Sequence, residues 1–412
     1  MSTTKMTTLI PQYMNSFSCI GSACEDTCCA GWQVTIDKST YKKYGRVRDK
    51  ELSPLLNKKV KKKNVDVSPE NYASMELDSK MQCSFLSEQN LCRIQQKLGE
   101  SFLSHVCATY PRTSNLVNNI LETSATMSCP EIARLALLNP NKMEFDMKEE
   151  SIHIRNMVIN RLQTDTEIND INKYFWELRS FSIDVLQNRT YYLWERLIIL
   201  GVFYQKLEQY LQDGMLDEIP HLISMYMSNL GEGRLKEGLD KLPTQYTFQL
   251  KVIKEIIDKH FLHTINNQRY LECFNETLQG LQYSDDCEFD EISVHYDEAY
   301  NDYYLPFIKD HEYILENYLV NYVYKNLFPV ARGNNLFEEY VMLIVHYSMI
   351  KMHLIGMAGF RKNEFKLEHV IKMIQSYSKT IEHNPSYLQA VIQLLNHNGI
   401  NTMTHMAVLI KN

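Results

Sequence analysis

The sequence predicts a mainly α-helical protein in which a small, cysteine-rich N-terminal domain precedes a larger, all-helical domain. Three observations lead to this prediction. Glycine and proline are scarce, with 14 and 11 residues in a chain of 412, which disfavours turn-rich β architectures. Eight of the ten cysteines lie within the first 129 residues. Apolar residues recur at helical spacing through the later part of the chain, as expected for helices that bury one face.

Charge divides the chain at the same place as the cysteines do. Residues 1–140 contain 17 Lys and Arg against 13 Asp and Glu, whereas residues 141–412 contain 26 against 37. The helical stretch SCPEIARLALL ends at Asn139 and Pro140, and a helix usually ends before a proline. We therefore predict a cysteine-rich domain over residues 1–140 and a helical domain over residues 141–412.

The first part contains one clear pair of elements after its first cysteines. Trp32, Val34 and Ile36 alternate with polar residues and precede Asp37, a pattern that predicts a short strand followed by a helix. The basic run from Lys58 to Lys63 is typical of a solvated loop or helix face. We expect no nucleic-acid partner.

The second part consists of stretches with helical periodicity. They are residues 172–187, 191–212, 248–262, 311–328 and 336–358. The last stretch is the most apolar, but it contains Glu338, Glu339, His346, Lys351 and His353. Charges are rare inside membrane spans, so we expect a buried helix and no membrane insertion.

The N-terminal segment shows no sign of export. Residues 1–18 lack the apolar core of a secretion signal and contain Pro11, so we expect a cytoplasmic protein. That compartment is reducing, and clustered cysteines there hold metals or carry out redox chemistry more often than they form disulfides.

The clustered cysteines are the candidate metal ligands. Their spacing is C-x4-C-x3-C-C followed by C-x8-C-x14-C-x21-C. Thiolates select zinc, copper(I) or iron–sulfur clusters, and four complete either a zinc tetrahedron or a cubane cluster. The eight candidates are Cys19, Cys24, Cys28, Cys29, Cys83, Cys92, Cys107 and Cys129.

Several arrangements of these thiols remain open. Neighbouring side chains diverge in helices and strands, so Cys28 and Cys29 favour a multinuclear cluster or two separate sites over a single ion. Buried free cysteines without metal are the alternative. We expect Cys273 and Cys287 to be dispensable and to lie in an acidic surface region.

Other motifs assign no catalytic or cofactor-binding residue. The C-x3-C-x2-C cluster motif is absent, because Gly31 occupies the position of its third cysteine. Gly231 and Gly233 follow a helical stretch, so they predict a helix end and turn and not a nucleotide-binding loop. His105 lies beside Cys107 and could ligate metal or act as a base, but a structural role is the favoured interpretation of this histidine and of the tyrosines of the later helices.

Four segments resemble one family. They are CSFLSEQNLCRIQQKLGESFLSHVCATYPR, TMSCPEIARLALLN, ENYLVNYVYKNLFP and FEEYVMLIVHYSMIKMHLIGMA. Together with the first cysteine cluster, they make nearly the whole chain similar to the flagellin lysine N-methylases. The N-terminal part also resembles a broader family of zinc- or iron-chelating proteins with clustered cysteines.

The resemblance implies a function that composition and spacing do not supply. It implies a protein-lysine N-methyltransferase that moves a methyl group from S-adenosylmethionine to flagellin lysines. It also implies that the eight N-terminal cysteines hold an iron–sulfur cluster, of the 4Fe-4S type, with zinc as the alternative. The competing hypothesis is a non-enzymatic iron–sulfur or zinc protein that acts as a redox or interaction module.

Overall fold

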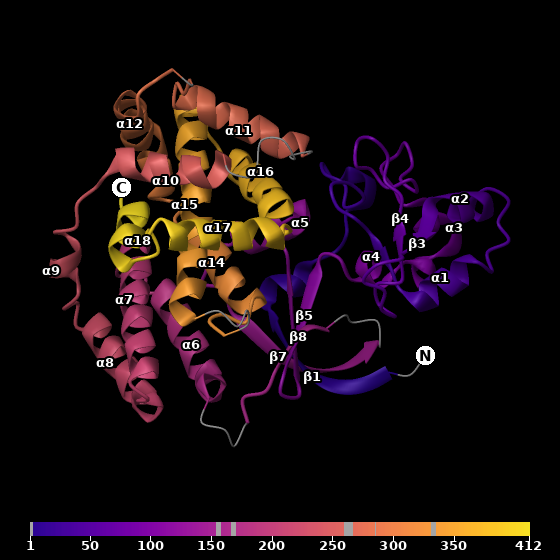
Figure 1. Cartoon of the computed structure of the whole chain (residues 1–412), viewed down its shortest axis with the longest axis horizontal. Coiled ribbons are helices and arrows are strands. Elements are labelled where there is room, and N and C mark those ends of the chain that lie inside the picture. Colours follow the sequence, from indigo (N-terminus) through magenta and orange to yellow (C-terminus); the bar gives the residue numbers. More distant parts are fainter. Residues whose placement is uncertain (1–2, 154–157, 166–169, 259–266, 285, 331–334) are drawn as a thin grey trace.

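A five-stranded mixed sheet connects a small N-terminal lobe to a large helical body in the computed structural model (Figure 1). The structure describes residues 3–153, 158–165, 170–258, 267–284, 286–330 and 335–412. The strands are β1 (Thr3–Pro11), β5 (Arg112–Val117), β6 (Ile120–Ala125), β7 (Phe145–His153) and β8 (Val158–Leu162), in the order β7-β1-β6-β5-β8. β1 is parallel to β6 and antiparallel to β7, and β5 is antiparallel to β6 and parallel to β8.

The predicted fold class is wrong on this point. A small cysteine-rich domain followed by an all-helical domain leaves no place for a sheet that takes strands from both sides of residue 140. β7 is charged, with Lys148, Glu149 and Glu150 in its centre, and pairs along its full length with β1 as an edge strand. Charged edge strands lack the apolar alternation that identifies buried strands. The domain boundary itself stays a prediction.

The N-terminal lobe has its own small core and a three-stranded sheet. Its elements are β2 (Thr35–Ile36), α1 (Lys38–Tyr44), α2 (Leu52–Lys59), β3 (Val60–Lys62), β4 (Ala73–Met75), α3 (Arg93–Leu98) and α4 (His105–Thr109). The predicted short strand and helix are β2 and α1, and the Asp37 side chain caps α1 by accepting from the Thr40 amide at 2.8 Å. A cap of this kind fixes where a helix begins.

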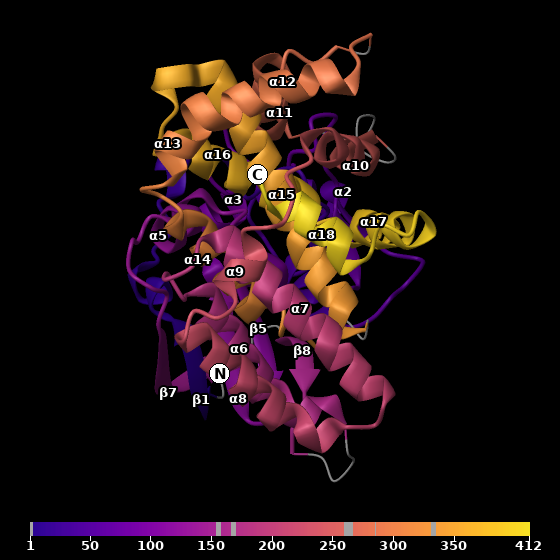
Figure 2. The same ribbon diagram turned by 90° about the vertical axis from the view of Figure 1, so that its left-hand side faces the viewer.

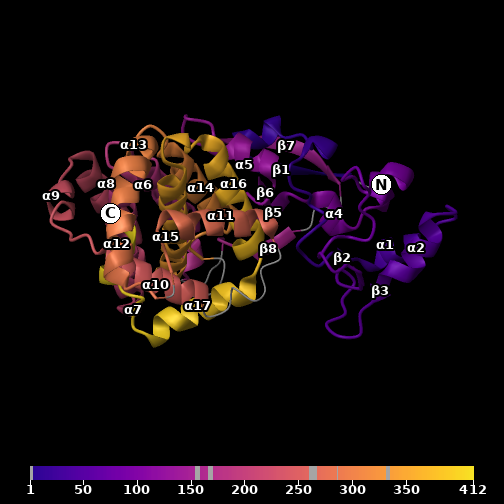
Figure 3. The ribbon, with the colours of Figure 1, turned by 90° about the horizontal axis from the view of Figure 1, so that it is seen from above.

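The helical body consists of α5 (Pro130–Leu137), which lies between β6 and β7 in sequence, and of the helices that follow β8. The helices after β8 are α6 (Phe175–Leu186), α7 (Leu193–Gln212), α8 (Ile219–Gly231), α9 (Lys236–Leu239), α10 (Tyr246–Asp258), α11 (Gln268–Gly280), α12 (Phe289–Glu298), α13 (Leu305–Ile308), α14 (Tyr313–Lys325), α15 (Leu336–Arg361), α16 (Leu367–Tyr377), α17 (Pro385–His397) and α18 (Met403–Ile410). Two π-helical segments, η6 (Ala299–Tyr304) and η8 (Ser378–Glu382), extend α12 and α16. Seen from above, the N-terminal lobe lies at one end of the molecule, with α9 at the other (Figure 3).

The helix α15 runs through the middle of the helical body (Figures 1 and 2). The stretch Leu336–Glu364 is long and apolar enough to cross a membrane by composition, but its apolar window is entirely buried inside the protein. This finding matches the prediction of a buried helix. α11 approaches it closely, because a Cβ at Gly280 would lie only 1.8 Å from the Gly356 carbonyl oxygen.

Buried polar contacts attach the helical body to the sheet. Arg179 of α6 donates to both carboxylate oxygens of Glu122 on β6, at 2.6 and 2.7 Å, and both side chains are nearly inaccessible. The Tyr13 hydroxyl donates to Asn321 of α14 at 2.7 Å and accepts from the Ala125 amide at 3.0 Å. A buried charge that loses its partner is costly, so these contacts fix one orientation of the body on the sheet.

We predict that the variant Arg179→Met is destabilised by about 3–5 kcal/mol, because it leaves the Glu122 carboxylate buried and unpaired. The double variant Arg179→Met/Glu122→Met removes both charges and should recover most of that loss. Urea unfolding of the three proteins measures the effect. A single variant within about 1 kcal/mol of the wild type would contradict this role for the pair.

A second prediction concerns pH. His353 of α15 is fully buried, with Nδ1 donating to the Met349 carbonyl at 2.7 Å and Nε2 accepting from the Tyr270 hydroxyl at 2.9 Å. Burial lowers the pKa of His353 to about 4, so the unfolded chain binds more protons between pH 6.5 and 4. Its contribution to stability, about 3 kcal/mol, is present above pH 6.5 and is lost as the pH falls toward 4.

Urea unfolding at pH 7.5 and pH 5 tests this expectation. His353→Leu should lower the free energy of unfolding at pH 7.5 and reduce its change between the two pH values. The matched control is His221→Leu on the exposed surface of α8, which should keep the wild-type pH dependence. Equal pH dependence in wild type and His353→Leu would show that this histidine is not the responsible group.

Candidate functional site

Five of the eight candidate cysteines line one small cavity in the N-terminal lobe, which we call the thiol cavity. Its volume is about 60 Å³, and its cysteines are Cys28, Cys29, Cys83, Cys92 and Cys107. They come from the loop before β2, the loop after β4, the residue that caps α3, and α4. All are free thiols, so the structure places segments far apart in sequence around one centre without disulfides.

The surroundings favour the protonated form of these thiols. Burial raises the pKa of Cys83 to about 11 and that of Cys107 to about 12. The pKa of Cys28 is raised first by its hydrogen bond with Cys29 and then by burial. A thiolate is the form that binds metal, and a nearby cation reverses such shifts. These thiols would therefore lose their protons only when a metal ion or another cation binds.

An unpartnered hydroxyl group faces the same cavity. Tyr44 lines it, and its buried hydroxyl oxygen has no hydrogen-bond partner among the residues that the structure describes. Burial, followed by the charges of Cys107 and Cys92, raises the pKa of Tyr44. An unsatisfied buried hydroxyl costs about 1–3 kcal/mol. A sulfur-rich, negatively charged centre in this cavity would accept a hydrogen bond from the Tyr44 hydroxyl.

The other three candidate cysteines form a second group outside the thiol cavity. Cys129 precedes the first residue of α5, and burial raises its pKa to about 11, with the charges of Cys24 and Cys19 acting in the same direction. The Cys24 thiol donates to the Asp26 carbonyl at 3.0 Å. The structure thus divides the eight cysteines into groups of five and three.

The residue types of the thiol cavity suit a metal centre, but their side chains are not arranged as one. As the side chains are placed, no group of three or more His, Cys, Asp or Glu within the described ranges has the arrangement of a metal site. The convergence of five thiols and one unpaired hydroxyl nevertheless fits a thiolate-bound centre by ligand type. The cysteine side chains would have to rearrange to bind such a centre.

The loop that carries Cys28 and Cys29 is attached to the helical body. Lys379 of η8 donates to both oxygens of Asp26, at 2.8 and 2.9 Å, and to the Thr27 carbonyl at 2.9 Å. Gln375 of α16 donates to Asp26 at 2.8 Å. Trp32 donates to the Cys28 carbonyl at 2.8 Å, and its ring lies 5.2 Å from that of His383. One helix near the C-terminus therefore positions the first cysteines.

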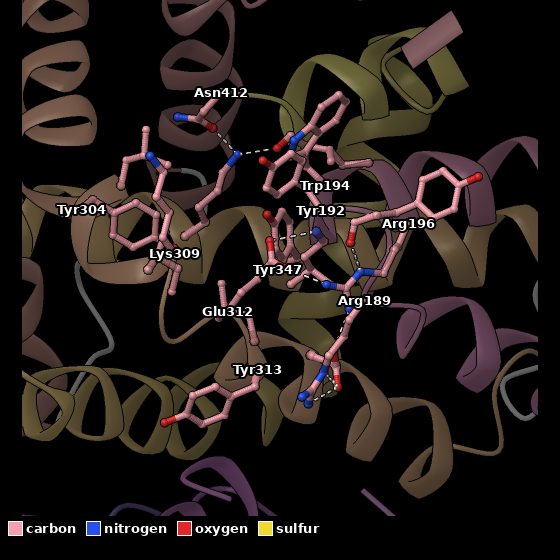
Figure 4. Close-up of a pocket in the computed structure, with 18 of the residues that line it drawn as sticks. Arg189, Tyr192, Trp194, Arg196, Tyr304, Lys309, Glu312, Tyr313, Tyr347 and Asn412 are labelled. Atoms are coloured by element: carbon pink, nitrogen blue, oxygen red, sulfur yellow. Dashed lines mark hydrogen bonds and ion pairs between the residues drawn. The ribbon is translucent and has the colours of Figure 1, made fainter. Parts of the chain in front are cut away.

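A second, larger cavity lies wholly within the helical body, and we call it the aromatic cavity (Figure 4). Its volume is about 740 Å³, and no residue lines both cavities. The aromatic residues that line it are Tyr191, Tyr192, Trp194, Tyr300, Tyr304, Tyr313 and Tyr347. Its charged residues are Arg189, Arg196, Lys236, Lys309, Lys351, Asp310, Glu312 and Glu316.

A network of ion pairs forms one wall of the aromatic cavity. The buried Glu316 accepts from Arg189 at 2.8 Å and from Arg196 at 2.7 Å. Arg196 also donates to Glu312 at 2.5 Å, and the Leu193 amide donates to the other oxygen of Glu312 at 2.8 Å. Burial raises the pKa of Glu312. These contacts hold the start of α7 against the start of α14.

Lys351 of α15 lies at another wall and is buried. Its ammonium group donates to the carbonyls of Leu409 and Ile410, at 3.2 and 2.7 Å, and to the Asn412 side chain. Burial lowers the pKa of Lys351 to about 7, whereas three oxygen acceptors favour the charged form. Lys351 thus holds the last residues of the chain beside the cavity.

Two buried tyrosines leave their hydroxyl groups available to the aromatic cavity. Tyr304 is 2% exposed and Tyr347 is 5% exposed, and both line the cavity. Neither hydroxyl makes a hydrogen bond to any other residue that the structure describes. Figure 4 shows Tyr304 and Lys309 on one side of the cavity, Trp194 and Tyr192 on the other, and Tyr347 between them.

Most histidines and late cysteines that the sequence highlighted have structural positions. His105 lies 3.9 Å from Asp37 and outside the thiol cavity. His346 bonds to the Tyr377 hydroxyl at 2.8 Å. Cys273 is completely buried in α11, so the expectation of a surface position is wrong for this residue, although it lies outside both cysteine groups. Tyr44, Tyr304 and Tyr347 escaped prediction, because 26 tyrosines in one chain look alike in sequence.

The fold and the two cavities described above define a largely helical protein with a group of thiols in its N-terminal lobe and a separate, larger cavity in its helical body. Residues 179–409 match the family described as FliB lysine N-methylase C-terminal domain, and the chain belongs to this family. The aromatic cavity lies almost entirely within the matched residues. Family membership makes a protein-lysine methyltransferase the class of enzyme to which this chain is related.

Individual relatives extend the similarity to the N-terminal lobe. A lysine-N-methylase of Salmonella typhimurium is 22% identical over 92% of this chain and 93% of its own length. The flagellar biosynthetic protein FliU of Salmonella muenchen is 32% identical over 43% of this chain and 97% of its own length. No solved structure matches the chain.

We predict that the variant Lys379→Met loosens the Cys28 loop, because Asp26 loses its partly buried cationic partner. Hydrogen exchange at residues 24–32 should become about tenfold faster, as expected when local opening is eased by about 1.4 kcal/mol. The matched control is Lys372→Met on the same helical segment, whose side chain pairs with Glu272 of α11 at 2.7 Å. Equal exchange in both variants would refute the attachment.

Proposed function

We propose that this protein transfers methyl groups from S-adenosylmethionine to lysine side chains of flagellin in the cytoplasm, and that its cysteines hold an iron–sulfur cluster. The family match over residues 179–409 is the observation that carries the proposal. The name of the flagellar relative that aligns with 43% of the chain supports flagellin as the substrate. The convergence of five thiols on one cavity supports the cluster.

The reaction is a displacement at a sulfonium methyl group. The neutral amine of the substrate lysine forms a bond to the methyl carbon while the bond between that carbon and sulfur breaks. The sulfonium becomes a neutral thioether, and the lysine nitrogen becomes a methylated ammonium. Free lysine has a pKa of about 10.4, so its proton must leave before attack, to water or to a carboxylate of the protein. A desolvated site eases this loss.

In this proposal the thiol cavity would supply the ligands of the cluster. Cys28, Cys83, Cys92 and Cys107 come from four separate segments, which lets four thiolates surround one centre. Cys29 hydrogen-bonds to Cys28, and Tyr44 has a free hydroxyl for a cluster sulfur. An iron–sulfur cluster, when bound, contributes folding energy and a one-electron couple. Zinc would use the same thiols.

The proposal predicts methyl transfer by anaerobically purified protein. Incubation with methyl-labelled S-adenosylmethionine and flagellin from the same organism should label lysine residues, as read by mass spectrometry of the digested flagellin. Full metal occupancy without any transfer would overturn the enzymatic function and leave a metal-binding interaction module.

The same preparations test the cluster independently. Cys83→Ser and Cys107→Ser should each lose at least about half of the bound iron and sulfide, because a cubane cluster needs four thiolates. The control variant Cys273→Ser changes a buried thiol outside both cysteine groups and should keep its iron. A colourless wild-type protein with stoichiometric zinc would contradict the cluster without affecting methyl transfer.

A further inference from the structure

We propose that the aromatic cavity binds S-adenosylmethionine, so that methyl transfer takes place in the helical body and not at the cysteines. The inference rests on the proposed methyltransferase function and names the site where that function is carried out. It assigns Tyr304, Tyr347 and Lys309 to donor binding, and it gives the thiol cavity a supporting role.

The sizes of the two cavities distinguish them as donor sites. Cofactor-sized ligands occupy cavities of roughly 300–1,000 Å³. The aromatic cavity, at about 740 Å³, falls within this range, whereas the thiol cavity, at about 60 Å³, is far below it. The aromatic cavity therefore has the volume for a nucleoside, and it is larger than two other cavities of the helical body, at about 370 and 470 Å³, that also fall within this range. The thiol cavity has room only for a compact inorganic centre.

Two tyrosine hydroxyl groups in the wall of the aromatic cavity are available to a ligand. Tyr304 and Tyr347 are almost entirely buried, yet within the described part of the chain their hydroxyl groups bond to nothing. Neither oxygen is among the fully buried side-chain atoms that lack a partner, so both hydroxyl groups are open to the cavity and can donate to a ligand. Ribose hydroxyls and adenine nitrogens are acceptors for such donors, and the ring faces attract a sulfonium by cation–π interaction.

Charges at the rim suit the amino-acid end of the donor. Lys309 and Asp310 are consecutive, exposed residues that line the cavity. Neither makes an ion pair with another residue of the described ranges. The methionine end of the donor carries one carboxylate and one ammonium group, so adjacent charges of opposite sign match it. A simple anion would leave Asp310 unmatched.

Apart from the exposed Lys236, the remaining charged residues of the cavity already bind other groups of the protein. Arg189 and Arg196 bind Glu312 and Glu316, and Lys351 binds carbonyl groups near the end of the chain. These contacts make the walls rigid before a ligand arrives. Such preorganisation reduces the entropy cost of binding. The ammonium groups of Lys236, Lys351 and Lys411 already lie 5.2, 5.4 and 4.8 Å from the ring centroids of Tyr191, Tyr347 and Trp194. The groups left to select a ligand are therefore the other rings, the two hydroxyls and the rim pair.

The test measures the affinity of the anaerobically purified full chain for S-adenosylhomocysteine by titration calorimetry. Tyr304→Phe and Tyr347→Phe each remove one hydroxyl and keep the ring, and each should raise Kd several-fold. The double variant should raise Kd at least tenfold. Lys309→Glu, at an exposed position that cannot disturb the core, should raise Kd at least tenfold by repelling the carboxylate.

The variant Tyr44→Phe reports on the thiol cavity, and the matched control is Tyr226→Phe, which removes a tyrosine hydroxyl of α8 outside both cavities. The Kd of each variant should stay within twofold of the wild-type value. If Tyr44→Phe weakens binding while the double variant and Lys309→Glu bind normally, the donor binds at the thiol cavity and the inference is overturned, although the proposed function survives. If wild-type protein neither binds the donor nor methylates flagellin, the proposed function fails as well.

Photo-crosslinking of labelled S-adenosylmethionine gives an independent location. Peptides that contain residues 300–316 or 336–352 should carry the label. A label confined to residues 19–32 or 83–112 would overturn the assignment regardless of the calorimetric result.

Discussion

The burial of α15 is the constraint on which the rest of the molecule depends. This helix is 26 residues long and almost completely inaccessible over its first 23 residues, so every side of it must face protein. A helix that is apolar all round is stable in water only when other elements enclose it. The surrounding helices enclose α15, and the glycine contact between α11 and α15 shows how closely one of them packs. The same helix contributes Tyr347 and Lys351 to the aromatic cavity, whose position is therefore fixed by the core.

The helix that follows α15 in sequence, α16, links the helical body to the N-terminal lobe. α16 and its π-helical extension η8 pack within the helical body and also bind the Asp26 loop through Gln375 and Lys379. The thiol cavity is thus coupled to the body that contains the aromatic cavity, although the two share no residue. Methyl transfer from a sulfonium requires no electrons. A cluster separated from the donor would accordingly act on the shape of the N-terminal lobe or on its redox state, and not on the transferred methyl group.

Sequence reasoning found the parts of this protein that have a local signature. The helices of the body followed from apolar periodicity, the buried α15 followed from its charges, and the cysteines followed from their number. The sheet was missed for physical reasons. β7 is a charged edge strand that looks like a linker. The β5–β6 hairpin turns at Asn118 and Asn119, and the positive φ of Asn118 is known only from the structure. The division of the cysteines into five and three, and the unpaired hydroxyls of Tyr44 and Tyr347, depend on tertiary partners that no local pattern encodes.

The central claim is that one chain separates an inorganic, thiol-bound centre from an organic donor site. The most direct measurement is a crystal structure of anaerobically prepared protein with S-adenosylhomocysteine, using diffraction data collected at the iron absorption edge. We expect an anomalous peak enclosed by Cys28, Cys83, Cys92 and Cys107, together with nucleoside density against Tyr304 and Tyr347. Nucleoside density in direct contact with the iron peak, or an empty aromatic cavity beside a fully occupied thiol cavity, would contradict the claim.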